Sequence, residues 1–232
     1  MAYQSAARLS TDVISYGPGA QTEAEYRLLG PVQGKRVLDL GCGGAQSAIA
    51  LAKQGAIAIG VDISVEQLAF ARRLMEDEEV RVELKHGDLA ELAFQRADSV
   101  DIVFSASALQ YVPDLNRVFR QVHRVLKPQG AFVFSIPHPI TAVANLGSST
   151  LRTTQQLSLE PETIVVERSY FDKSPIEDRW EHTTFTEYHR PTSEIFMGLV
   201  RSGYRVDVVL EPEGTEESLL PQILIMRARK EA

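Results

Sequence analysis

A glycine-rich turn is the stretch of this sequence that is best suited to hold a ligand. The chain reads VLDLGCGGAQ at residues 37–46, so that Gly41 and Gly43 follow a compact apolar segment. Glycine permits a steep turn and leaves bare backbone that a ligand can approach closely. Three interpretations are open at this point: the turn holds a pyrophosphate, it holds a ligand without a phosphate, or it only lets the chain bend.

Three acids near this turn narrow the choice. Asp39 precedes the turn by two residues, Asp62 ends the next apolar segment, and Asp88 follows Gly87 after a third. A carboxylate in the position of Asp62 can accept hydrogen bonds from both hydroxyls of a ribose. Asp88 is placed to accept from the exocyclic amine of adenine. Together the two acids predict a ligand that contains adenosine.

Two further residues separate the candidate adenosine ligands. The dinucleotide fingerprint is G-x-G-x-x-G, and Gln46 stands where its third glycine belongs. Asp39 would repel a phosphate but suits a cationic amino group. The sequence therefore favours a ligand with an ammonium or sulfonium and no phosphate, which is S-adenosylmethionine (SAM), over NAD.

Apolar segments that alternate with helical patterns must position these residues. The expected strands cover 36–40, 56–62, 81–88, 100–107 and 130–137, with the turn KPQG before the last of them. The expected helices cover 22–30, 46–55, 64–79 and 114–126, and Ser64 and Gln67 form a capping box. This order predicts a mostly parallel sheet with helices on both faces, whose ligands bind at the carboxyl ends of the strands.

The chain past residue 137 is expected to differ. Residues 140–190 are polar, carry several aromatic residues and include a strand-like run at 163–171, so we expect an insertion or cap. A helix beginning at Pro191 and two closing strands at 204–210 and 221–229 follow. We expect those two strands to form an antiparallel pair at the edge of the sheet.

His138 is the candidate catalytic residue. It follows the fifth strand in SIPHP, where a neutral imidazole could take a proton from an acceptor hydroxyl, amine or acidic carbon, or could simply shape the pocket. His189 is a weaker candidate by the same argument, because a structural role beside Arg190 is simpler. Cys42 has no second cysteine or histidine at a useful spacing, so we expect it to fill the turn.

Charge and composition limit the partners. The formal net charge is −7, which argues against a nucleic-acid partner. One cysteine excludes an internal disulfide and a multi-cysteine zinc site, and we expect no bound metal. Without an apolar run of membrane-spanning length or a signal peptide, we expect a cytoplasmic monomer or homodimer with no membrane partner.

Four stretches within about residues 16–138 resemble the class I SAM-dependent methyltransferases, in particular the small-molecule branch with quinone-biosynthesis and natural-product enzymes. They are VLDLGCGGAQSAIALAKQGAIAIGVDIS, HGDL, DIVFSASALQYVPD and VFRQVHRVLKPQGAFVFSIPHP. The resemblance implies one domain over 1–232, with a Rossmann-like, doubly wound α/β sheet of seven strands and an antiparallel last strand. It also implies in-line methyl transfer to N, O or C of a small molecule, with S-adenosylhomocysteine as product. A non-catalytic module that binds SAM or a nucleotide is the alternative, an NAD-dependent oxidoreductase is less favoured, and methylation of macromolecules ranks low.

The resemblance also assigns roles to residues. Those implied to bind the cofactor are Tyr16 as a lid, Gly41, Cys42 and Gly43 along the methionine and ribose, Asp62 on the ribose, Ile63 on adenine, Asp88 and Leu89 at the adenine edge, Ser105 through its carbonyl, and Gln67, Gly87 and Gln110. Those expected to line the acceptor pocket are Tyr111, Trp180, His182, Tyr188 and His189.

Overall fold

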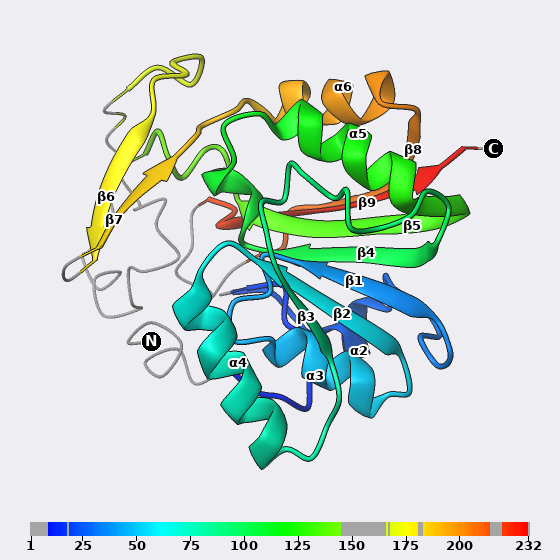
Figure 1. The fold of residues 1–232 in the computed structure, drawn as a ribbon. Coiled ribbons are helices and arrows are strands. Elements are labelled where there is room, and N and C mark those ends of the chain that lie inside the picture. The colour runs from blue at the N-terminus through cyan, green and yellow to red at the C-terminus, as the bar shows by residue number, and fades with distance from the viewer. Residues whose placement is uncertain are drawn as a thin grey trace.

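A twisted sheet of seven strands forms the centre of the protein (Figure 1). The computed structural model describes residues 9–17, 19–144, 166, 168–180, 183–213 and 220–231. The strands, in spatial order, are β3 (Glu83–His86), β2 (Ile57–Asp62), β1 (Arg36–Leu40), β4 (Val100–Ala106), β5 (Leu126–Pro137), β9 (Ile223–Lys230) and β8 (Tyr204–Leu210). In this sheet of the described residues, β9 runs in the direction opposite to all the other strands. The predicted Rossmann-like fold with a reversed last strand is confirmed.

Helices cover both faces of the sheet, because alternate strand residues point to opposite sides. Figure 1 shows α5 and α6 on one face and α2, α3 and α4 on the other. The bounds are α2 Glu23–Tyr26, α3 Gln46–Lys53, α4 Val65–Asp77, η1 Leu109–Tyr111, α5 Leu115–Val125 and α6 Thr192–Arg201. Leu38 and Leu40 of β1 pack into the core under α5 and α6, while Val37 packs into the core under α3. One strand thus contributes to both cores.

The first helix is shorter than the 22–30 that the sequence indicated. Arg27 adopts a left-handed conformation with φ 53° and ends α2 after one turn. The carboxylate of Glu23 then accepts the backbone amides of Leu28 (3.0 Å) and Leu29 (2.7 Å), which a continuing helix would have used itself. A side chain at the start of the helix therefore competes successfully with the helix for its next amides.

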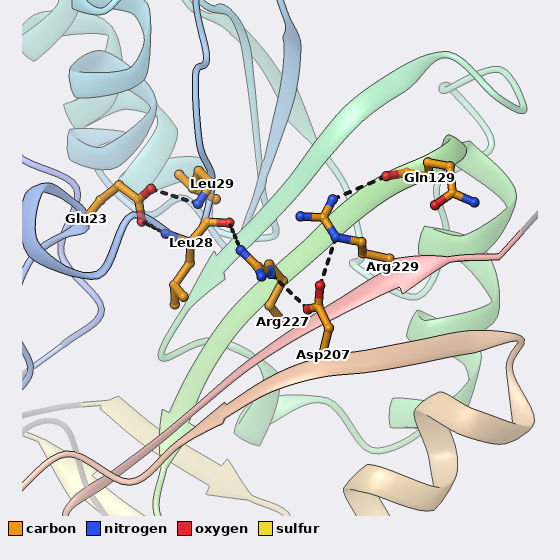
Figure 2. Close-up of polar contacts among 7 residues, drawn as sticks. All are labelled: Glu23, Leu28, Leu29, Gln129, Asp207, Arg227 and Arg229. Carbon is orange, nitrogen blue, oxygen red and sulfur yellow. Dashed lines mark hydrogen bonds and ion pairs between the residues drawn. The ribbon is translucent and has the colours of Figure 1, made fainter.

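A polar network ties this N-terminal segment to the reversed strand (Figure 2). The guanidinium of Arg227 in β9 donates to the carbonyl of Leu28 over 3.1 Å and pairs with Asp207 of β8. Arg229 pairs with the same carboxylate and donates to the carbonyl of Gln129. The antiparallel edge of the sheet is thus linked to the N-terminal segment and to the first part of β5.

Two local features differ from the sequence prediction. The strand β5 begins at Leu126, because KPQG is a bulge within the strand: Gln129 has φ 64° and the register with β4 shifts there. At α4, Ser64 accepts the amide of Gln67 as expected, but its own amide donates to Asp62. The side chain of Gln67 therefore does not complete a capping box.

The region predicted as a cap contains a separate antiparallel hairpin of β6 (Ile176–Trp180) and β7 (Thr183–Glu187). Figure 1 shows this hairpin beyond the edge where β1 and β4 end. Its connection to the sheet includes the amide of Tyr188, which donates to the carbonyl of Gln110 over 2.8 Å. Within the strand-like run 163–171, residues 163–165 and 167 lie outside the described residues, and the others form no strand.

None of the helices in the described ranges is long and apolar enough to cross a membrane.

Candidate functional site

The glycine turn after β1 lies directly against the loop after β4. Gly41 has φ 70°, and a Cβ added to it would lie 2.3 Å from the Cβ of Ala108. Gly43 also adopts a left-handed conformation, with φ 53°. Both the conformation and the close approach require the absence of a side chain at Gly41. The ends of β1 and β4 therefore meet at one place, as expected for a ligand site on a parallel sheet.

Asp62 at the end of β2 holds this turn in place. Its Oδ2 accepts the amide of Gly43 and its Oδ1 accepts the amide of Ser64, each over 2.8 Å. The backbone carbonyl of Asp62 accepts the amide of Gly87 over 3.0 Å, which brings the end of β3 to the same edge. Each carboxylate oxygen has a second lone pair, and the residue is partly exposed. The carboxylate can therefore accept hydroxyl groups of a ligand as well.

The surface next to Asp62 offers an apolar face. The side chain of Ile63 is 68% exposed, which is unusual for a large apolar residue beside a polar turn. Leu89 is buried, whereas Asp88 is exposed and one of its oxygens accepts the amide of Ala90. A flat ring lying on Ile63 would cover apolar surface that is now exposed to water. The roles assigned to these three residues stay predictions.

Asp39 is a buried acid behind the turn. It is only 3% exposed. Burial, and then the negative charge of Asp62, raise the pKa of Asp39 to about 7. A cationic group placed near this pair of acids would stabilise the ionised form of Asp39. The site therefore suits a ligand with a positive charge better than a phosphate.

Cys42 packs inward from the turn. Its thiol lies so close to Gly60 of β2 that a Cβ there would be 2.9 Å from the sulfur. Burial and the charges of Asp39 and Asp62 raise the pKa of the thiol well above its usual range. A protonated, buried thiol is a poor nucleophile, so this residue fills space in the turn.

Three polar atoms near the turn have no hydrogen-bond partner within the described part of the chain. They are Oε1 of Gln67, Oγ of Ser107 and Oε1 of Gln110. Buried polar atoms normally find a partner, so their common position at the strand ends indicates a polar ligand. With the glycine turn, Asp39 and Asp62, they fit S-adenosylmethionine. Ser105 is fully buried in β4 and its hydroxyl donates to the carbonyl of Leu40, while the role predicted for its own carbonyl stays a prediction.

The side chain of Tyr16 packs into the core. The ring is fully buried, packs edge-on against Tyr26 and Phe104, and its hydroxyl donates to Glu23 over 2.5 Å. Its carbonyl accepts the hydroxyl of Ser135. Moving this ring over a ligand would remove it from the core and break these contacts; the lid role of Tyr16 stays a prediction.

A second hollow, which we call the acceptor cleft, lies between η1, the end of β5 and the hairpin. It is open to solvent, and the centres of water-sized molecules can occupy about 40 Å³ of it. The polar residues in its lining are Gln110, His138, Thr141, Glu187, Tyr188, His189 and Arg190. Gln110 belongs to the loop that touches the glycine turn through Ala108. The cleft and the turn therefore share one wall.

Both ring nitrogens of His138, at the end of β5, have partners within the protein. Its Nδ1 accepts the amide of Ile140 over 3.1 Å, so the proton is on Nε2, which donates to Oε1 of Glu211 over 2.8 Å. Both ring nitrogens are therefore engaged, and the imidazole has no lone pair left for an acceptor proton. His138 is a positioning residue at the end of β5, where its carbonyl also accepts the amide of Thr141.

His189 lies in the same cleft with a different pattern. Its Nε2 is 2.8 Å from the carbonyl of Tyr170, which can only accept, so this nitrogen carries the proton. The residue is 7% exposed, and burial lowers its pKa. The imidazole is therefore neutral near pH 7.

Of the other residues predicted to line the acceptor pocket, one lines the cleft and one packs elsewhere. Tyr188 lines the cleft, and the guanidinium of Arg190 lies 5.8 Å from its ring centre. Tyr111 packs instead against Phe185 of β7 at a centroid distance of 5.9 Å. The side chain of Trp180 and the whole of His182 lie outside the described residues.

Sequence reasoning missed the part that two charged residues play in this cleft. Arg190 donates to the carbonyls of Val112, Pro113 and Tyr188 and has no ion pair with any residue that the structure describes. Glu187 is a buried acid at the end of β7. The available signal in the sequence was that Glu187 and Arg190, two charged residues, flank Tyr188 and His189 in a polar segment. Only the fold shows that both charged residues line a cleft.

Comparisons with known proteins agree with this geometry. A methyltransferase domain model matches residues 38–134. A solved S-adenosylmethionine-dependent methyltransferase from Mesorhizobium loti is 30% identical, with a TM-score of 0.73 over 89% of this chain and 96% of that one. A solved protein from Listeria monocytogenes is 26% identical, with a TM-score of 0.75 over 90% of this chain and 98% of that one.

A curated relative matches over a shorter stretch. The ubiquinone biosynthesis O-methyltransferase of Bordetella avium is 40% identical over 108 residues, which are 47% of this chain and 45% of that protein. The match thus spans less than half the length of this relative. From the domain match, the whole-chain similarity and the geometry of the turn, we conclude that the chain belongs to the class I S-adenosylmethionine-dependent methyltransferases.

Proposed function

We propose that this protein transfers the methyl group of S-adenosylmethionine to an N, O or C atom of a small-molecule acceptor. The observation that carries the proposal is the shared wall: the loop after β4 contacts the glycine turn at Ala108 and lines the acceptor cleft at Gln110. A cofactor held by the turn would thus lie beside an acceptor held in the cleft. Transfer by in-line displacement requires this arrangement.

The residues that would hold the cofactor follow from the site. Asp62 would accept the ribose hydroxyls, Ile63 would lie on the adenine, and Asp39 would offset the charge of the amino group. When bound, the cofactor supplies a methyl group on a sulfonium, which is already activated toward nucleophiles. The protein's own contribution is then to align the acceptor and to exclude water, which can lower a barrier by roughly 7–11 kcal/mol at best.

A small acceptor is favoured by the hairpin and by charge. The segment Glu187–Arg190 lines one side of the cleft together with η1 and the end of β5, which favours a compact acceptor. The net charge of −7 disfavours a nucleic-acid acceptor. The Bordetella relative is named an O-methyltransferase of ubiquinone biosynthesis, which makes oxygen the first acceptor atom to test.

The test is a methyl-transfer assay. The protein is incubated with S-adenosylmethionine and, separately, with aromatic hydroxyl compounds, amines and acidic carbon compounds, and S-adenosylhomocysteine and methylated product are quantified by mass spectrometry. The proposal expects both products in equal amounts with at least one class. Cofactor binding without turnover in a screen of cell metabolites would instead favour the non-catalytic SAM-binding module.

A further inference from the structure

We propose that His189 is the general base of the acceptor cleft and takes a proton from a hydroxyl group of the acceptor through its Nδ1. This inference rests on the proposed methyl transfer and deepens it, because it names a catalytic residue and an acceptor class. It differs from the sequence prediction, in which His138 was the first candidate for this task.

The geometry fixes which nitrogen can act. The carbonyl of Tyr170 holds the protonated Nε2 at 2.8 Å, so that the lone pair is on Nδ1. No described residue donates a hydrogen bond to that Nδ1. The residue is 7% exposed and belongs to the lining of the cleft. An acceptor atom without a protein partner, on a residue in the wall of a cleft, is suited to a donor on a ligand.

The ring is held firmly enough to serve this purpose. The ring of Tyr170 packs edge-on against it, with a centroid distance of 5.6 Å and an interplanar angle of 73°. Tyr170 is itself fixed, because its hydroxyl accepts the amide of Thr192 over 2.9 Å and lies 3.2 Å from the hydroxyl of that residue. The first turn of α6 therefore orients the imidazole through one intermediary residue.

Burial keeps the imidazole neutral, because it is the main reason that the pKa of His189 is lowered. The hydrogen bond to the carbonyl of Tyr170 and the charge of Asp172 act in the opposite direction, and the positive charges of Arg168 and Arg190 lower the pKa further. The other titratable groups that line the cleft are Glu187, Tyr188 and His138. A neutral imidazole at physiological pH is ready to accept a proton.

The two histidines of the cleft thus differ in the hydrogen bonds that their ring nitrogens make. His138 accepts a hydrogen bond from an amide on one nitrogen and donates from the other, so both nitrogens have protein partners. His189 receives nothing on Nδ1 from the described residues. Of the two, only His189 can exchange a proton with a ligand without first losing a protein contact.

The chemistry of the base selects a class of acceptor. A neutral hydroxyl is a weak nucleophile until its proton leaves, whereas a neutral amine attacks with a lone pair that it already has. In the proposed step the hydroxyl proton moves to Nδ1, the oxygen forms a bond to the methyl carbon, and the carbon–sulfur bond breaks with its electron pair staying on sulfur. The imidazolium then releases the proton to solvent.

An imidazole with a lowered pKa is matched to an acidic hydroxyl rather than to an alkyl alcohol. A phenolic hydroxyl has a pKa of about 10, which is close enough for efficient transfer to a positioned base. The apolar part of the lining includes Leu109, Ile136 and Ile195, which suits an aromatic ring. The acceptor class is therefore a phenol or a similar acidic hydroxyl compound.

The kinetic test uses His189→Gln with two probes, catechol and 4-nitrocatechol, at pH 8. Glutamine retains a donor for the carbonyl of Tyr170 but cannot accept a proton. Catechol is mostly protonated at this pH and 4-nitrocatechol is mostly ionised, so only the first needs a base. We expect kcat with catechol to fall by about 10²- to 10⁴-fold and kcat with 4-nitrocatechol to fall by less than roughly tenfold.

The matched control is His123→Gln, since burial also lowers the pKa of His123, which is not part of the cleft lining. It should leave both rates within about twofold. Equal losses with the two probes in His189→Gln, or no loss with either, would overturn the inference. If wild-type protein binds S-adenosylmethionine but methylates neither hydroxyl probe, the hydroxyl class is overturned while methyl transfer to another class stands. If it does not bind the cofactor, the proposed function itself fails.

A second readout does not depend on turnover. Nitrogen NMR of protein labelled in its histidine rings should show His189 protonated at Nε2 and unprotonated at Nδ1 at pH 7. Adding catechol in the presence of S-adenosylhomocysteine should shift the Nδ1 signal, while the signals of His123 stay in place. Protonation at Nδ1, or a signal that catechol does not move, would contradict the assignment.

Discussion

The backbone amide of Gly43 donates a hydrogen bond to Oδ2 of Asp62 over 2.8 Å, which joins the end of β1 to the end of β2. The other oxygen of the same carboxylate accepts the amide of Ser64 at the start of α4. One side chain thus shapes the ligand turn and also presents free lone pairs to a ligand. Removing it should therefore affect binding more than the loss of a single ligand contact would.

Replacing Asp62 with alanine should weaken S-adenosylmethionine binding by more than roughly tenfold, or about 1.4 kcal/mol, because both the ribose contacts and the shape of the turn are lost. Calorimetric titration measures this directly. Glu66→Ala is the control, since Glu66 is an exposed acid two residues into α4. An unchanged affinity in Asp62→Ala would place the ribose elsewhere.

Gly41→Ala tests the close approach of the two loops. The added methyl would lie 2.3 Å from the Cβ of Ala108, and the residue has φ 70°. The variant should therefore lose unfolding free energy through both overpacking and backbone strain, and overpacking alone should cost about 1–3 kcal/mol. Gly34→Ala has a similar φ of 73° but nothing within 4 Å of the new Cβ, and should cost only about 1–2 kcal/mol. Denaturant unfolding compares them. Equal losses would show that the contact with Ala108 is unimportant.

Asp39→Asn should change how stability depends on pH. The folded-state pKa of about 7 is above the ordinary pKa of 3.8 for an aspartic acid, so folding favours the protonated acid. The wild-type protein therefore loses stability from this group as the pH rises from about 4 to 7. The asparagine variant lacks this loss and should be more stable at pH 8 by on the order of 1–3 kcal/mol, with a smaller difference at pH 5. A difference that is constant with pH would contradict the raised pKa.

Glu23 and Glu25 form a matched pair on one short helix. Glu23 is buried, and its carboxylate accepts hydrogen bonds from the hydroxyl of Tyr16 and from the amides of Leu28 and Leu29. Glu25 is exposed and caps the helix. Glu23→Ala leaves several buried donors without an acceptor and should cost about 2–4 kcal/mol of unfolding free energy. Glu25→Ala should cost about 0.5–1 kcal/mol. Thermal unfolding measures both. Similar costs would mean that the Tyr16 network adds little.

The sheet could be predicted from sequence because its signals are local. Apolar strands alternate with helices, and the glycines and acids come at strand ends that a parallel sheet must bring to one edge. Two local details could not be predicted, because they depend on which of two groups accepts a given amide. The carboxylate of Glu23 accepts amides that a longer α2 would have used. At the start of α4, Asp62 and not Gln67 accepts the amide of Ser64.

The cleft was harder to predict because its chemistry depends on tautomers. His138 and His189 look alike in sequence, and each is followed at once by a charged or rigid residue. What separates them is a contact of each ring with a distant or backbone atom: Nδ1 of His138 with an amide, and Nε2 of His189 with a carbonyl. Such contacts follow from tertiary packing, not from residue type or spacing.

The central claim is that the glycine turn and its acids hold S-adenosylmethionine. Calorimetric titration of the purified protein with S-adenosylmethionine, S-adenosylhomocysteine and NAD tests it most directly. We predict saturable one-to-one binding of the first two, weakened by Asp62→Ala, and no measurable binding of NAD. Tight binding of NAD with none of S-adenosylmethionine would contradict the account.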